Sequence, residues 1–174
     1  MRKHESLFVL IIAGPTGVGK TTLSKMLSRY YDCVYLSEDE IAKETFPDEY
    51  KNIEDYPDKV EIIARELLKR AKEKFNRGKC IVMDRINLEK EFIEETKKTF
   101  HNHLILKVLW PSLETTIERD RKREGWASGE NAIKLFYKKY EVLKPVIGAE
   151  NYIDNSYQTP EETFERFIAY IERT

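Results

Sequence analysis

The stretch that most constrains the fold of this chain is residues 14–21, Gly-Pro-Thr-Gly-Val-Gly-Lys-Thr. It matches the phosphate-binding pattern G-x-x-x-x-G-K-[ST] at every specified position. The apolar run 7–13 leads into it and predicts a buried strand, whereas residues 21–28 predict the first turns of a helix. A strand, a glycine loop and a helix in this order are the context in which the pattern binds phosphate.

The residue types in this loop suit an anion. A loop that wraps a phosphate turns its N–H groups inward, and Gly14, Gly17 and Gly19 adopt the required positive φ at little cost. The helix that follows adds partial positive charge at its N-terminus. We expect Lys20 to reach the β- and γ-phosphates of ATP and the Thr21 hydroxyl to coordinate Mg²⁺.

Thr16, Val18 and Thr22 complete the predicted nucleotide site, and Thr22 is expected to donate to the α-phosphate. The alternative interpretation is a plain glycine turn between a strand and a helix. Lys-Thr at the start of the helix has no structural purpose in such a turn, which favours the nucleotide site.

Length and charge limit the class of protein. The chain has 174 residues, enough for a sizeable core, and we expect one domain over 1–174. Its formal net charge of −1 gives no global basic field for nucleic acid, although a local patch could still bind an oligonucleotide. Cys33 and Cys80 are interpreted as small buried apolar residues outside any disulfide framework. The run 7–13 is too short to span a membrane, so we expect a cytoplasmic protein with no obligatory protein partner.

Strand-like and helical segments alternate along the rest of the chain. Further strands are predicted at 34–37, 81–83, 104–110 and 152–154. Helices are predicted at 38–45, 60–75, 88–100, after Ser112, at 131–143 and from Thr159 to about 173. This alternation predicts a parallel α/β sheet covered on both faces, whose ligands bind beyond the carboxyl ends of the strands.

Two acidic residues follow predicted strands and are candidates for chemistry. Asp39 is expected near the transferred phosphate, where a carboxylate can accept the proton of an attacking hydroxyl; capping the next helix is its alternative role. Asp84 ends an apolar strand and is expected to hold Mg²⁺, with a turn-forming role as the alternative. Arg85 and Asn87 are open between substrate contact and structural roles. In the capping alternative, Ser37 and Asp39 are the caps and Glu38 or Glu40 is a solvent charge.

A basic segment at 119–123 is predicted at the end of a helix, before a glycine-containing stretch. Arg119 and Arg123 are four residues apart, share a helical face and are expected to close over ATP, whereas Arg121 points elsewhere. A charged helix C-terminus is the alternative. The sequence leaves Trp126 open between covering a base and packing under the flap. Asp154 is expected near the adenine.

Together these segments resemble the small P-loop kinases, most of all the group of polynucleotide 5′-hydroxyl kinases and zeta-toxin-like proteins. The resemblance rests on residues 14–22, 37–41, 82–88 and 118–123. It implies a P-loop NTPase three-layer α/β/α sandwich, with a five-stranded parallel sheet in the order 2-3-1-4-5 and a lid at about 120–130. It also implies an ATP- and Mg²⁺-dependent phosphotransferase, with Asp39 as general base and Arg123, supported by Arg119, on the ATP phosphate.

The acceptor implied by this resemblance stays open between an oligonucleotide 5′-hydroxyl and a small-molecule alcohol. Polynucleotide kinases often place an arginine three residues after the base, where this chain has Ala42. A nucleoside or nucleotide kinase is an alternative, but Arg65 is the only arginine in 42–66 to bind an acceptor phosphate. A nucleotide-dependent switch or ATPase module is the alternative of another class.

The segment 40–60 is expected to form the acceptor pocket. Its acidic residues are Glu40, Glu44, Asp48, Glu49, Glu54, Asp55 and Asp58, and its basic residues are Lys43, Lys51 and Lys59. This balance favours a neutral or cationic acceptor over a polyanion.

Overall fold

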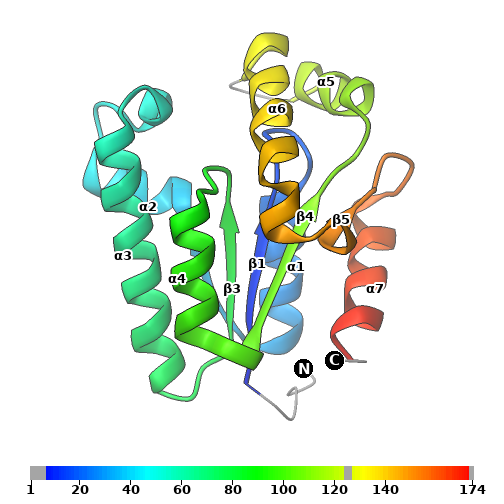
Figure 1. Ribbon diagram of the computed structural model, residues 1–174. Helices are drawn as coiled ribbons and strands as arrows, with labels where there is room; N and C mark the ends of the chain where they lie inside the picture. The colour runs from blue at the N-terminus through cyan, green and yellow to red at the C-terminus, as the bar shows by residue number, and fades with distance from the viewer. Residues whose placement is uncertain (1–6, 124–126, 173–174) are drawn as a thin grey trace.

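A computed structural model describes residues 7–123 and 127–172 (Figure 1). Its strands are β1 Val9–Ala13, β2 Val34–Ser37, β3 Ile81–Arg85, β4 Leu104–Leu109 and β5 Tyr152–Ile153. All neighbouring strands pair in parallel, in the order β2-β3-β1-β4-β5. The predicted α/β fold and strand order 2-3-1-4-5 are therefore confirmed.

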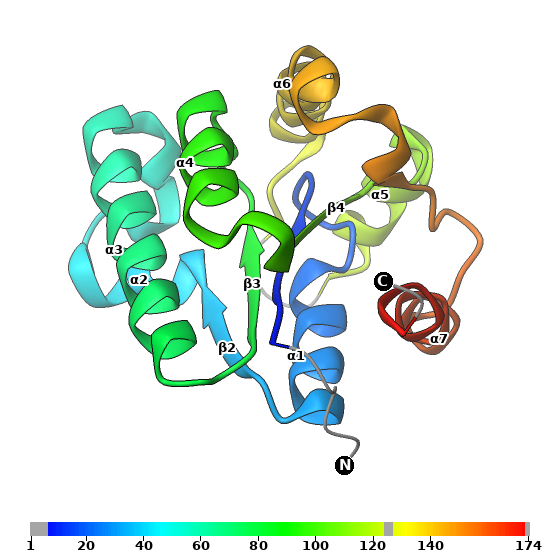
Figure 2. The ribbon, with the colours of Figure 1, turned by 60° about the horizontal axis from the view of Figure 1, so that its bottom comes forward.

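Helices connect the strands and cover the sheet. The α-helices are α1 Lys20–Tyr31, α2 Glu38–Thr45, α3 Pro57–Asn76, α4 Lys90–Phe100, α5 Leu113–Arg121, α6 Glu130–Ile147 and α7 Pro160–Ile171. Short 3₁₀ turns are η1 Tyr50–Asp55, η2 His101–His103 and η3 Ala149–Asn151. Figure 2 shows α1 and α7 on one side of the sheet, with α3, α4 and α6 on the other.

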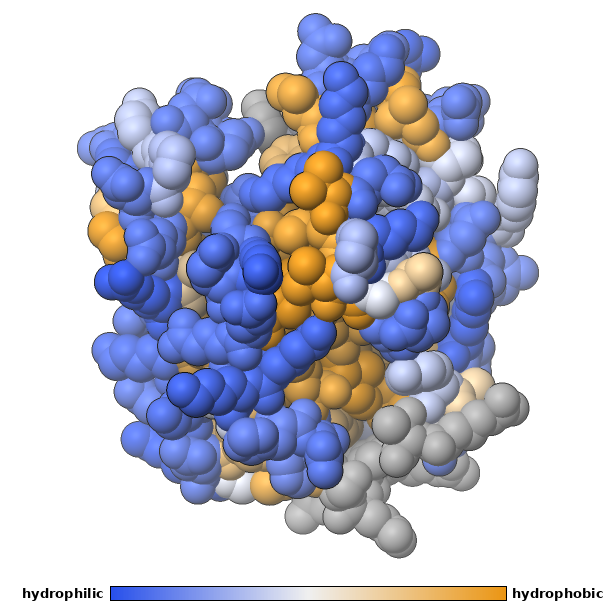
Figure 3. All heavy atoms as spheres, viewed as in Figure 1, coloured by the Kyte–Doolittle hydropathy of each residue, from blue (hydrophilic) through white to orange (hydrophobic). Residues whose placement is uncertain are grey.

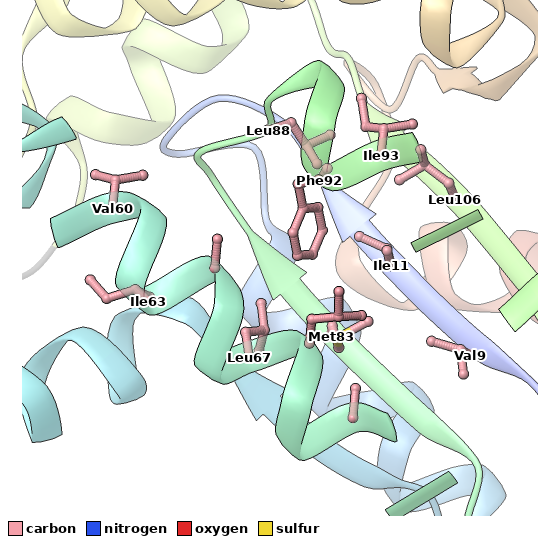
Figure 4. Close-up of a cluster of buried hydrophobic side chains, with 14 of the residues drawn as sticks. Val9, Ile11, Val60, Ile63, Leu67, Met83, Leu88, Phe92, Ile93 and Leu106 are labelled. Atoms are coloured by element: carbon pink, nitrogen blue, oxygen red, sulfur yellow. The ribbon is translucent and has the colours of Figure 1, made fainter. Parts of the chain in front are cut away.

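Two apolar clusters hold the three layers together. Successive strand residues face opposite sides of a sheet, so Val9 and Ile11 join the cluster under α3 and α4, whereas Leu10 and Ile12 join the cluster under α1 and α7. Both faces of β1 are thus buried, which explains its continuous apolar sequence. Figure 4 shows Phe92 of α4 entering the first cluster.

Several element ends differ from the prediction. Helix α3 begins at Pro57 rather than at residue 60, because proline at the first helical position gives up no intrahelical bond. Helix α6 continues to Ile147 although Pro145 lies in its last turn, and Gly148, with φ +93°, ends it. Ser112 caps α5 as predicted, and Thr159 forms a capping box with Glu162 at α7.

The interpretation of the two cysteines was wrong. Cys33 and Cys80 form a disulfide with their Cα atoms 4.8 Å apart, and both are half-buried. The cause is strand register: Val34 pairs with Ile81, so the residues that precede β2 and β3 become neighbours. A sequence separation of 47 residues hides this proximity.

The surface is mainly hydrophilic, with apolar side chains gathered between α4 and α6 (Figure 3). Leu135 and Val142 of α6 are 66% and 78% exposed. Among the helices in the described ranges, none combines the length and the apolar character needed to cross a membrane.

Candidate functional site

A cavity of about 390 Å³ lies at the phosphate loop, beyond the carboxyl ends of the central strands. The structure brings most of the predicted site residues to this cavity: Thr16, Gly17, Gly19, Lys20, Thr21, Thr22, Asp39, Asp84, Arg119 and Arg123. Its outer part is lined by Tyr50, Lys51, Ile53 and Glu54 from the segment between α2 and α3. The position at the strand ends agrees with the general rule for ligands of parallel sheets.

The phosphate loop is held by close backbone contacts. Gly14 has φ +139°, and a Cβ atom there would lie 2.5 Å from the carbonyl oxygen of Leu109. Its N–H donates to the hydroxyl of the buried Tyr140 over 2.9 Å, and that hydroxyl donates to the Ile86 carbonyl. Tyr140 therefore links α6 both to the loop and to the segment after β3; the sequence analysis did not single it out.

Lys20 lies where a phosphate-binding lysine is needed. Its ammonium donates to the carbonyl oxygen of Pro15 over 2.7 Å, within the loop itself. Burial lowers the pKa of Lys20, while the carboxylates of Asp84 and Asp39 act in the opposite direction. An anion in the loop would add a further negative partner for this partly desolvated charge.

Asp39 lies in the first turn of α2, and its side chain opens onto the cavity. Although the residue is exposed to solvent, the walls of the cavity crowd its carboxylate. Desolvation therefore raises the pKa of Asp39, and Lys20 and Arg123 counteract that rise. A carboxylate with a raised pKa suits proton transfer better than an ordinary surface acid.

Asp84 is 4% exposed at the end of β3 and accepts a hydrogen bond of 2.7 Å from the Tyr35 hydroxyl. Thr21 lines the same cavity. The described residues contain no group of three or more acidic, histidine or cysteine side chains that could hold a metal. Mg²⁺ needs no such group, because it takes one or two protein oxygens and completes its shell with water and phosphate. Thr21 and Asp84 thus fit the predicted Mg²⁺ site.

Glu38 is not a solvent charge, the role that the capping alternative offered for Glu38 or Glu40, because it is only 2% exposed. Its carboxylate accepts from the N–H groups of Ile86 and Asn87, at 2.7 and 3.0 Å, and lies 3.6 Å from Arg85. It therefore joins the start of α2 to the segment after β3. Sequence spacing gave no sign of this, because the partners lie 48 and 49 residues away.

Arg85 is fixed by contacts within the protein and also lines the main cavity. Its guanidinium donates to the carboxylate of Glu89 over 2.8 Å and to the Asn87 carbonyl, and it lies 3.8 Å from the ring centre of Phe92. Its side chain is fully buried. Helix α4 begins after Glu89, so Asn87 is not its cap.

The two predicted flap arginines occupy different places. Arg119 donates to backbone carbonyls of the loop 155–158, the nearest being Asn155 at 2.9 Å. Helix α5 ends at Arg121, so Arg123 lies beyond it, within 3.5 Å of the Thr16 hydroxyl. The expectation of a shared helical face was therefore wrong, although both arginines line the main cavity.

The segment expected to form a lid is held at both of its described ends. Asp120, 2% exposed, accepts from the N–H groups of Ser128 and Gly129 at 3.2 and 3.0 Å. Ser128 also contacts Thr16 at 2.8 Å. Trp126 lies outside the described residues.

A smaller cavity of about 280 Å³ adjoins the loop on the side of α7 and is lined by Val18, Leu109, Arg119, Asn155 and Pro160, among others. Asp154 does not line it; the carboxylate instead accepts from the N–H and hydroxyl of Ser156. The turn after β5 is thus near this cavity, with Asn155 rather than Asp154 facing it.

Comparisons with known proteins agree with this architecture. A family model described as "AAA domain" matches residues 9–142. No protein with a curated description matches the chain.

Solved structures show the same fold at low identity. A shikimate kinase from Bacteroides thetaiotaomicron is 15% identical, with a TM-score of 0.73 over 96% of this chain and 99% of that one. A sugar kinase from Janibacter sp. HTCC2649 is 17% identical, with a TM-score of 0.75 over 96% and 95%. The Pnkp1/Rnl/Hen1 RNA repair complex contains a chain that is 20% identical, with a TM-score of 0.66 over 82% of this chain and 47% of that one.

Proposed function

Because the chain belongs to the AAA domain family, whose model spans the phosphate loop and both candidate carboxylates, we propose that it is a kinase that transfers the γ-phosphoryl group of ATP to a hydroxyl acceptor. The observation that carries this proposal is the meeting of Lys20, Asp39 and Asp84 in one cavity. A glycine loop alone would bind a nucleotide. A carboxylate exposed beside it supplies a base for an acceptor.

The nucleotide would occupy the two adjoining cavities. Its triphosphate fits the loop, where N–H groups, Lys20 and the α1 N-terminus supply positive charge. Its base fits the smaller cavity, where Leu109 and Pro160 offer apolar surface and Arg119, held by the 155–158 carbonyls, offers a flat cation. When bound, Mg²⁺ would neutralise charge on the β- and γ-phosphates, held by Thr21 and Asp84.

The acceptor would enter from the side of Tyr50 and Lys51, so that its hydroxyl reaches Asp39. Asp39 takes the proton of that hydroxyl as the new O–P bond forms to the γ-phosphorus. The bond from the β–γ bridging oxygen to the same phosphorus breaks, and ADP leaves. Lys20 and Arg123 stabilise the negative charge on the transferring group.

The test is transfer from γ-labelled ATP with Mg²⁺ to a panel of acceptors, namely 5′-hydroxyl oligonucleotides, nucleosides, nucleoside monophosphates, sugars and amino sugars. Asp39→Asn should lower kcat by about a hundredfold or more while changing the ATP KM by less than about threefold. Glu40→Gln, which removes an exposed charge from the same turn, is the matched control and should transfer normally.

Two outcomes would contradict the proposal. If Asp39→Asn impairs ATP binding alone, Asp39 is not the base. If wild-type protein binds ATP and hydrolyses it slowly, with no acceptor on the panel stimulating turnover, the chain acts as a nucleotide-dependent switch instead.

A further inference from the structure

A second and larger cavity, of about 730 Å³, lies between the N-terminal halves of α3 and α4. It adjoins the acceptor side of the main cavity, and Glu54 lines both cavities. The segment after β3 separates the two: Arg85 and Ile86 face the main cavity, whereas Asn87 and Glu89 face this one. A molecule with its hydroxyl near Asp39 would therefore find further room on this side.

Part of the wall is apolar. Pro57, Val60 and Ala64 of α3 face Phe92 of α4 across the cavity. Figure 3 shows apolar surface between the upper parts of α3 and α4, flanked by hydrophilic residues. Such a wall suits the carbon skeleton of a small organic molecule.

The charge of this cavity is negative. Five glutamates line it, Glu54, Glu61, Glu89, Glu91 and Glu95, against only Arg65 and Lys139. Arg65 is paired with Glu61, and Lys139 with Glu89. Among the described residues no cation pairs with Glu54, Glu91 or Glu95. The three remaining carboxylates favour a ligand with positive charge.

Asn87 provides an independent sign of a ligand. The residue is 3% exposed and lines this cavity. Its backbone N–H bonds Glu38, but its side-chain amide has no hydrogen-bond partner in the described part of the chain. Neither the nitrogen nor the oxygen of this amide is fully enclosed by the described residues, so the amide is open to the cavity. A buried amide normally has a partner, so this one is available to a polar group in the cavity.

We propose that this cavity binds a small organic cation, a compound with protonated amino groups on a hydroxyl-bearing carbon skeleton. The amines pair with Glu54, Glu91 and Glu95, the skeleton covers the apolar wall, and Asn87 bonds a polar group. A second step rests on the proposed function: the same molecule is the phosphoryl acceptor, and one of its hydroxyls is directed to Asp39.

The experiment measures calorimetric binding of 2-deoxystreptamine, a diamine with three hydroxyls, in the presence of Mg²⁺ and AMP-PNP. Its di-N-acetyl derivative is the neutral counterpart. The test variant is Glu91→Gln/Glu95→Gln, and the matched control is Glu94→Gln, which removes an exposed charge from the same helix outside the cavity. Urea unfolding and AMP-PNP binding verify that each variant is folded.

We expect wild type and Glu94→Gln to bind the diamine alike and the double variant to bind about tenfold more weakly, with AMP-PNP binding unchanged. We also expect the neutral derivative to bind at least tenfold more weakly than the diamine to wild type. Equal binding of the diamine by the double variant and wild type, or equal binding of the two compounds, would overturn the proposal.

Transfer from γ-labelled ATP separates this proposal from the kinase proposal. If neutral acceptors are phosphorylated equally by wild type and the double variant while the diamine is not bound, the cavity assignment fails and the kinase stands. If no acceptor is labelled but diamine binding still depends on Glu91 and Glu95, the kinase fails and the cation site stands.

Discussion

Gly14 and Gly19 both have positive φ, yet only Gly14 is enclosed. A methyl group at Gly14 would meet the Leu109 carbonyl, whereas nothing lies within 4 Å of a Cβ atom at Gly19. We expect Gly14→Ala to lower the free energy of unfolding by more than Gly19→Ala, because it adds a backbone clash to a conformational cost of about 1–3 kcal/mol. Urea denaturation of both variants measures this, and equal losses would show that the loop can move away from β4.

Asp39 leads to a prediction about pH. A base acts only when deprotonated, so kcat/KM should fall as the pH falls through the Asp39 pKa, which burial raises above the usual value of about 3.9. Arg123 counteracts that rise. Removing this cation with Arg123→Gln should therefore move the acidic limb of the pH–rate profile to higher pH.

The control for this shift is Arg121→Gln, which removes the same charge from an exposed side chain paired with Glu130. Its acidic limb should coincide with that of wild type. An unmoved limb in Arg123→Gln would show that the limb belongs to another group than Asp39.

Site residues that belong to a local sequence motif or a strand end could be predicted. Residues whose partners lie far away in the sequence could not. Lys20, Thr21 and Asp84 belong to a loop motif or a strand end, and the structure places all three at the cavity. Glu38 looked like any surface acid, because its partners are contributed by a segment 48 residues away.

The hydroxyl of Tyr140 ties helix α6 to the phosphate loop. Tyr140 accepts from Gly14 and donates to Ile86, and the residue is fully buried. Tyr140→Phe leaves an N–H and a carbonyl unpaired and should lower the free energy of unfolding by about 1–3 kcal/mol. It should also weaken AMP-PNP binding, because the first glycine of the loop loses its anchor.

Urea unfolding and AMP-PNP titration measure both effects. The matched control is Tyr157→Phe, which removes the same hydroxyl from a side chain that is 97% exposed and should change neither quantity. If Tyr140→Phe lowers stability and leaves nucleotide affinity intact, the hydroxyl supports α6 alone.

The existence and order of the elements followed from apolar periodicity, but several ends did not. Two of these ends involve proline: Pro57 starts α3, and α6 continues through Pro145 to Ile147. At Pro57 the missing N–H costs little, because the N–H groups of the first turn have no partner within the helix. Pro145 gives up a bond to the preceding turn and still lies within α6, so a proline by itself does not locate the end of a helix.

For the molecule as a whole, the strand order came from the family resemblance, and strand pairing then created a contact that the sequence concealed. The parallel register of β2 and β3 brings Cys33 beside Cys80. The same crossover brings Glu38 to the segment after β3, so the edge of the sheet that holds Asp39 and Asp84 is built from segments distant in sequence. Local sequence patterns therefore predict the helices and strands, whereas the arrangement of the candidate site depends on how the assembled sheet brings distant segments together.

A nucleotide bound across this edge should stabilise the entire fold, because it contacts the ends of several strands at once. At a hundred times its Kd, AMP-PNP with Mg²⁺ should add about 2.7 kcal/mol to the free energy of unfolding. For a domain of this size that is a rise of roughly 5–10 °C in Tm. Lys20→Ala should fold but lose most of the shift at the same concentration, since the loop then lacks its phosphate-binding ammonium. Thermal scans of both proteins, with and without the analogue, decide this: an equal shift in Lys20→Ala would place the nucleotide outside the phosphate loop.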